Sequence, residues 1–63
     1  MDDATLLMEL EAVARKLEVR VRYEDIHTPG GLCTVRGQRM IILPRAYAAR
    51  DRAAVLAREL SAI

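Results

Sequence analysis

Two side chains of this sequence have the chemistry of a base and a nucleophile. His27 is the only histidine and Cys33 the only cysteine, and they lie six residues apart. An imidazole within hydrogen-bond reach of a thiol could hold it as a thiolate, provided that a third group orients the ring. No neighbouring residue supplies that third group. We therefore predict that Cys33 is a small buried strand residue and His27 a solvated loop residue, and that the chain has no catalytic residue and is not an enzyme.

The glycines Gly30 and Gly31 could present backbone N–H groups to an anion. A phosphate-binding loop, however, leads into a helix and carries a Lys-Ser or Lys-Thr pair, and neither feature is found here. One cysteine and one histidine also cannot supply the four ligands of a structural zinc site. We predict that the glycines form a tight turn, and that the chain has neither a metal site nor a bound cofactor.

Arginine supplies nine of the ten basic residues, a bias that fits either bidentate anion recognition or a GC-rich genome. The candidates for an anion-binding stripe on the outer face of a sheet are Arg20, Arg22, Arg36 and Arg39. Strand alternation places the first two on one side. No exposed aromatic residue is interleaved among them to stack on bases, and the net charge is only +1, so nucleic acid is a disfavoured partner.

The elements that must position these residues follow from the spacing of apolar side chains. Residues 4–18 have the three-and-four spacing of an amphipathic helix, whose apolar residues are Leu6, Leu7, Leu10, Val13, Ala14 and Leu17. Asp2 and Asp3 suit the amino-terminal end of this helix. A second helix is predicted over residues 50–62, with one face formed by Ala49, Ala53, Leu56, Leu60 and Ile63.

Between the helices the period changes to that of strands. Residues 19–24 alternate between apolar and charged side chains, and residues 32–35 and 39–43 read as a hairpin that turns at Gly37. One run is apolar at every position, namely Met40, Ile41, Ile42 and Leu43, and Pro44 ends it. Such a run is expected of a central strand covered by helices on one face and by a second subunit on the other.

These elements predict a single α+β domain over residues 1–63, with the order helix, strand, β-hairpin, helix and a three-stranded sheet with two helices on one face. A chain this short buries only about 60% of its unfolded surface. It has no Phe, no Trp and no cysteine pair, although 52% of its residues are hydrophobic. We therefore predict a homo-oligomer, a dimer or higher, whose interface includes Met40, Ile41, Ile42 and Leu43.

The acidic amino terminus and the absence of an apolar run of about 18 residues predict a cytoplasmic protein with no membrane association.

Residues 31–62 carry a resemblance to a known family. The matching residues are Gly31 and Leu32, the run at 40–43, Arg50 and Arg52, and the segment at 55–62 that reads VLARELSA. They resemble the part of ImmA/IrrE-type bacterial zinc metallopeptidases that ends in the His-Glu-x-x-His helix. Glu59 stands at the motif's glutamate, whereas Arg58 and Ala62 stand where the two histidines would be. Since a guanidinium repels Zn²⁺, the resemblance implies a domain that has lost its metal and its hydrolytic activity.

The chain also resembles short bacterial proteins of uncharacterised function that combine a Val-x-Val-Arg-Tyr-Glu strand with a Gly-Gly-Leu-Cys turn. That resemblance assigns no activity. Three functional hypotheses remain: a non-enzymatic module that oligomerises and binds an unidentified protein partner, an anion or nucleic-acid binder that uses the arginine-rich sheet face, and a degenerate metallopeptidase-like regulatory domain. The first accounts best for the high aliphatic content.

Overall fold

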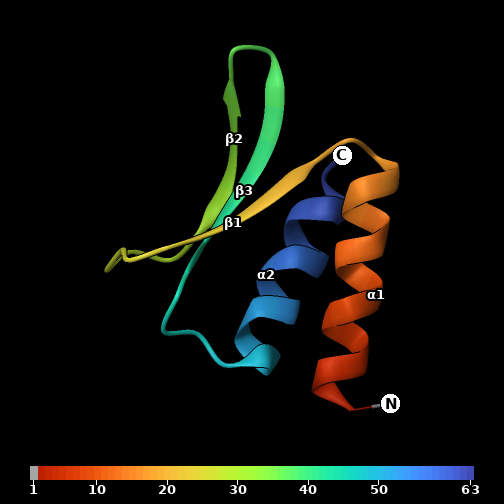
Figure 1. Cartoon of the computed structure of the whole chain (residues 1–63), viewed down its shortest axis with the longest axis vertical. Coiled ribbons are helices and arrows are strands. Elements are labelled where there is room, and N and C mark those ends of the chain that lie inside the picture. Colours follow the sequence, from red (N-terminus) through yellow and green to blue (C-terminus); the bar gives the residue numbers. More distant parts are fainter. Residues whose placement is uncertain (1) are drawn as a thin grey trace.

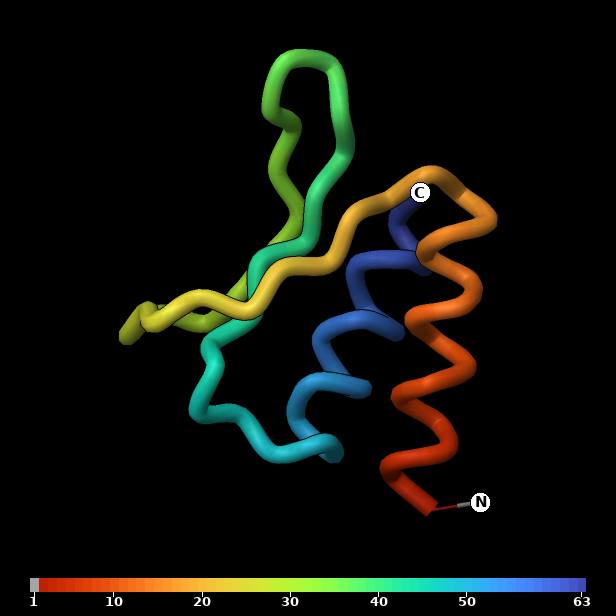
Figure 2. The backbone as a smooth tube through the Cα atoms, in the orientation of Figure 1, coloured from red at the N-terminus to blue at the C-terminus, as the bar shows by residue number. Residues whose placement is uncertain are grey.

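The computed structural model describes residues 2–63, which form two helices and a three-stranded sheet (Figure 1). In chain order the elements are α1 (Asp3–Lys16), β1 (Arg20–Glu24), β2 (Gly31–Val35), β3 (Gln38–Pro44) and α2 (Ala49–Ser61). The helices pack side by side on one side of the sheet and run in the same direction (Figure 2). The predicted α+β class and the predicted order of elements are confirmed.

The first helix is capped at both ends. At its start, the Asp2 carboxylate accepts a hydrogen bond of 2.7 Å from the Thr5 N–H, which lowers the pKa of Asp2. At its end, Glu18 adopts a left-handed conformation with φ of 60°, and the Val19 N–H bonds to the Ala14 carbonyl at 2.8 Å. This arrangement is a Schellman motif, and it ends α1 two residues before the predicted boundary at Glu18.

The second helix has no side-chain cap at its amino-terminal end. Ala48 occupies its N-cap position and offers no side-chain hydrogen bond to the first turn, so the cap interaction that α1 has is missing here. Neither α1 nor α2 is long and apolar enough to cross a membrane, and no other helix occurs among residues 2–63.

The strands lie in the order β1, β3, β2. β3 pairs in parallel with β1 and antiparallel with β2, so the predicted central strand does occupy the centre of the sheet. The β2–β3 hairpin turns through Arg36 and Gly37, whose φ angles are 54° and 80°. Two consecutive positive φ values define a type I′ turn, which matches the twist of the flanking strands. The predicted turn at Gly37 is therefore confirmed, and this end of the hairpin extends beyond the helices (Figure 1).

Gly30 fixes where the hairpin begins. A Cβ atom added to Gly30 would lie 1.9 Å from the carbonyl oxygen of Ile42 in β3, closer than any real contact. A Cβ atom on the neighbouring Gly31 would meet nothing within 4 Å. The loop that leaves β1 therefore approaches the backbone of β3 at a point where only glycine fits.

The core lies between the helices and one face of the sheet. Its largest fully buried side chains are Ile41, Leu43 and Leu56. Since side chains alternate along a strand, Met40 and Ile42 point to the opposite face, which no helix covers. In register with Met40 on this open face are Arg20 of β1 and Cys33 of β2.

Candidate functional site

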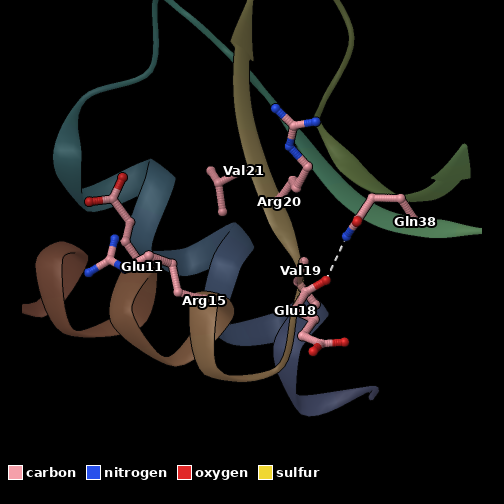
Figure 3. A pocket seen from close by; sticks show the side chains of 7 residues that line it. All are labelled: Glu11, Arg15, Glu18, Val19, Arg20, Val21 and Gln38. Atoms are coloured by element: carbon pink, nitrogen blue, oxygen red, sulfur yellow. Dashed lines mark hydrogen bonds between the residues drawn. The ribbon is translucent and has the colours of Figure 1, made fainter.

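An open trough lies between the carboxyl-terminal half of α1 and the outer edge of β1 (Figure 3). Its volume is about 810 Å³, and it is lined by Glu11, Arg15, Glu18, Val19, Arg20, Val21 and Gln38. Because β1 is an edge strand, its outer backbone groups face this trough without a strand partner. Gln38 closes one end through a hydrogen bond of 2.6 Å from its side-chain amide to the Glu18 carbonyl oxygen.

The trough is lined by equal numbers of acidic and basic side chains. Glu11 and Glu18 oppose Arg15 and Arg20, and no ion pair is formed by these four side chains within the described part of the chain. Balanced charges give the trough no strong preference for anions or for cations. Its extended shape and the free strand edge are features of peptide-binding grooves.

A cluster around Tyr23 ties the two sides of the trough together. The Tyr23 hydroxyl donates a hydrogen bond of 2.6 Å to the Glu11 carboxylate of α1. The Arg52 guanidinium of α2 lies 4.4 Å from the centre of the Tyr23 ring, within cation–π range. Burial, followed by the bond to the negatively charged Glu11, raises the pKa of Tyr23 to about 12. The cluster therefore joins α1, β1 and α2 and keeps the phenol protonated.

The four arginines of the predicted anion-binding stripe are not on one surface. Arg20 and Arg22 share the open face of the sheet, as strand alternation predicts. Arg22 is paired with Glu24 of the same strand at 2.8 Å, which offsets its charge. Arg36 lies in the hairpin turn, and Arg39 points to the face opposite Met40, which is the side of the sheet that carries the helices. The structure thus brings together two of the four.

The four residues of the predicted interface are also divided between the two faces. Ile41 and Leu43 are fully buried in the core under the helices, so they are inaccessible to a second subunit while the domain is folded. Met40 is also buried, and only Ile42 is half-exposed on the open face. Alternation along β3 explains the division, because a run that is apolar at every position must contribute to both faces.

His27 and Cys33 lie in different environments. His27 is exposed in the loop between β1 and β2, whereas Cys33 is a half-buried free thiol of β2 on the open face of the sheet. No hydrogen bond joins them within residues 2–63. No group of three or more His, Cys, Asp or Glu side chains within these residues is placed to hold a metal ion.

Glu59 is engaged by its neighbour on α2. The Arg58 guanidinium donates from Nε to the Glu59 carboxylate at 3.2 Å, and its Nη2 lies 3.1 Å from the same oxygen. This contact gives the carboxylate a structural partner. Ala62 follows at the C-cap of the helix.

Exposed apolar residues on one side of α1, together with Leu17 at its C-cap, form the second candidate surface. Leu6, Val13 and Leu17 are 39%, 42% and 44% exposed, and Leu10 between them is half-buried. We call these four residues the α1 stripe. Their spacing predicts one apolar face that also includes Leu7 and Ala14, but of these six residues the structure buries only Leu7 and Ala14. The apolar sector of α1 is therefore wider than the surface that α2 and the sheet cover.

No family model matches the chain, and neither a curated protein nor a solved structure is detectably similar to it. The resemblance to ImmA/IrrE-type metallopeptidases therefore stays a prediction. Sequence patterns could not locate the trough, because its lining comes from three elements that only the tertiary fold brings together. The α1 stripe left no separate signal either, because its residues belong to an ordinary amphipathic face and only the position of α2 decides which of them are covered.

Proposed function

We propose that this protein is a non-enzymatic interaction module that associates with further copies of itself. The observation that carries the proposal is the α1 stripe, because three of its aliphatic side chains stay 39% to 44% exposed in the single subunit. A chain of 63 residues has few means to compensate for exposed apolar surface. Covering this surface with a second subunit would add stability that the single domain lacks.

The expected strength of this association follows from the exposed area. Burying a fully exposed Leu or Val contributes about 1.5–3 kcal/mol, so covering the partly exposed stripe contributes about 2–4 kcal/mol per subunit. Association itself costs about 4 kcal/mol or more. For the two subunits together the gain is about 4–8 kcal/mol, so a net stabilisation of at most about 4 kcal/mol remains, which corresponds to a reversible dimer with a dissociation constant of about 1 mM.

The polar side chains support a role without catalysis. Glu59 is held by Arg58, Arg22 is paired with Glu24, and the Tyr23 phenol is hydrogen-bonded to Glu11. Each of these contacts has a structural explanation that requires no catalytic role. We also place the module in the cytoplasm, a location supported by the free thiol of Cys33.

Sedimentation equilibrium tests the proposal directly. The apparent mass should rise toward that of a dimer as the protein concentration increases from about 5 µM to about 1 mM. A chain that stays monomeric over this whole range would refute self-association. Loss of the effect in a variant with a charge in the α1 stripe would assign the association to α1.

A second candidate is anion binding on the open face of the sheet, which Arg20 favours because it shares this face with Arg22 and is not paired with an acidic side chain within residues 2–63. Titration with inorganic phosphate or a short oligonucleotide at low salt should then show saturable binding that weakens as salt is added. The substitution Arg20→Gln should reduce it, and Arg50→Gln, on the exposed start of α2, is the matched control. Absence of binding at low salt would eliminate this candidate.

A further inference from the structure

The α1 stripe has the spacing of a helix-pairing seam. Its residues lie at intervals of four, three and four along α1, which is the alternation of core positions in paired helices. The seam covers about three helical turns. One flank of the stripe is Leu7 and Ala14, which are buried in the chain's own core. The other flank faces solvent and is therefore the side on which a partner helix would meet charged residues.

Two opposite charges occupy this solvent flank. Glu9 directly precedes Leu10, and Lys16 directly precedes Leu17, so the two lie one heptad apart on the same side of the stripe. Both side chains are exposed, and neither forms an ion pair within the described chain. The flank is thus acidic toward the amino end of α1 and basic toward its carboxyl end.

We infer that the α1 stripe is the docking surface for a second copy of this chain, with the two α1 helices paired antiparallel about a twofold axis. This inference rests on the proposed self-association and assigns its surface and geometry. An antiparallel pair matches Leu10 with the partner's Val13, and it brings Glu9 of each subunit beside the partner's Lys16. A parallel pair would instead bring the solvent flank of each helix against the partner's other flank, which holds Leu7 and Ala14 and is already covered by the partner's own core.

The first arm of the test changes the stripe itself. Val13→Lys places a charge in the centre of the seam without entering the core, so the fold is retained and circular dichroism should be unchanged. The dimer dissociation constant should rise at least tenfold. Met8→Lys is the matched control, because Met8 is 69% exposed but lies on the opposite side of α1 from the stripe. This control should dimerise like the natural chain.

The second arm tests the orientation by reversing charges. Glu9→Lys and Lys16→Glu should each weaken the homodimer, because each creates two like-charge contacts in the antiparallel pair. The double variant E9K/K16E should recover the natural affinity to within about threefold. An equimolar mixture of the two single variants should form a heterodimer tighter than either homodimer, because every contact is then between opposite charges.

The outcomes separate this inference from the proposed function. A natural chain that stays monomeric up to about 1 mM overturns both. A dimer that is insensitive to Val13→Lys overturns the assigned surface and leaves self-association standing. A dimer that is lost in Val13→Lys but not recovered in the double charge variant, or not formed in the mixture, overturns the antiparallel geometry. Recovery in both charge experiments supports the full inference.

Discussion

The two helices of this domain are similar in length but are used differently. α2 buries four residues, and no large hydrophobic side chain within it is exposed. α1 buries only Leu7 and Ala14, whereas Leu6, Met8 and Val13 are exposed. α2 therefore holds the core together, and α1 covers the core with a small part of its apolar surface. The difference shows that the number of apolar residues in a helix does not predict how many are buried when two helices pack on one small sheet.

The comparison predicts unequal effects of truncating side chains in the two helices. Leu56→Ala in α2 removes a fully buried side chain and should lower the free energy of unfolding by about 3 kcal/mol. Val13→Ala in α1 should change it by about 0.5 kcal/mol at most when the chain is dilute and monomeric. Urea unfolding followed by circular dichroism measures both, and losses of similar size would show that α1 and α2 share the core equally.

The contact between Tyr23 and Glu11 should account for much of the remaining attachment of α1 to the sheet. Tyr23→Phe removes the hydrogen bond of 2.6 Å while keeping the ring against Arg52, and it should cost about 1 kcal/mol. Tyr47→Phe is the matched control, since no hydrogen bond of the Tyr47 hydroxyl occurs within residues 2–63. An equal loss in both variants would contradict a specific role for the bond.

The same contact predicts a dependence on alkaline pH. The pKa of Tyr23 is raised from 10.0 to about 12 in the folded chain, so the folded state holds the phenolic proton more tightly than the unfolded state. The resulting stability is fully present below pH 10 and is lost as the pH rises from 10.0 toward about 12. In a Tyr47→Phe background, tyrosinate absorbance reports this titration, and an ordinary pKa near 10.0 in the folded protein would contradict it.

The helix ends offer a way to strengthen α2 toward the level of α1. Ala48 leaves the first turn of α2 without a side-chain acceptor, so Ala48→Ser should raise the free energy of unfolding by about 0.5–1 kcal/mol. Ala46→Ser, also an exposed alanine but outside the cap, is the control and should be neutral. A cap variant no more stable than this control would mean that backbone or solvent already satisfies the first turn.

The carboxyl-terminal cap of α1 gives the smallest effect. Glu18 adopts a positive φ that costs a residue with a Cβ atom some energy, so Glu18→Gly should stabilise the chain by about 0.5 kcal/mol. Glu9→Gly within the same helix should destabilise it by about 1 kcal/mol. Thermal unfolding at low concentration measures both changes in stability. Changes of opposite sign would verify the Schellman motif, and changes of the same sign would contradict it.

The sequence was sufficient to predict the order of elements, the hairpin turn and the central position of β3. Each of these depends on local signals: the change of apolar period after α1, Gly37 between two β-prone runs, and four consecutive apolar residues in β3. These features can be predicted because residues close together in the sequence determine them.

The surfaces could not be predicted in the same way. Placing Arg39 away from Arg20 requires the register between β1 and β3, and separating the exposed Leu6 from the buried Leu7 requires the position of α2. Glu18 carries no sequence signal for a left-handed residue, because glycine is the usual choice there. The tight turn predicted at Gly30 and Gly31 is not formed, because Gly31 already begins β2 and neither glycine has a positive φ. The close backbone approach that requires Gly30 is a tertiary property, which the sequence could not reveal.

The approach of Gly30 to Ile42 also makes the preceding loop a place for engineering. Since the start of the hairpin is fixed at Gly30 itself, the exposed residues His27, Thr28 and Pro29 upstream of it are not needed to aim β2. The entropy of closing a loop grows slowly with its length, so a foreign epitope grafted between His27 and Pro29 would be displayed without disturbing the sheet. A domain of 63 residues could in this way serve as a minimal display scaffold.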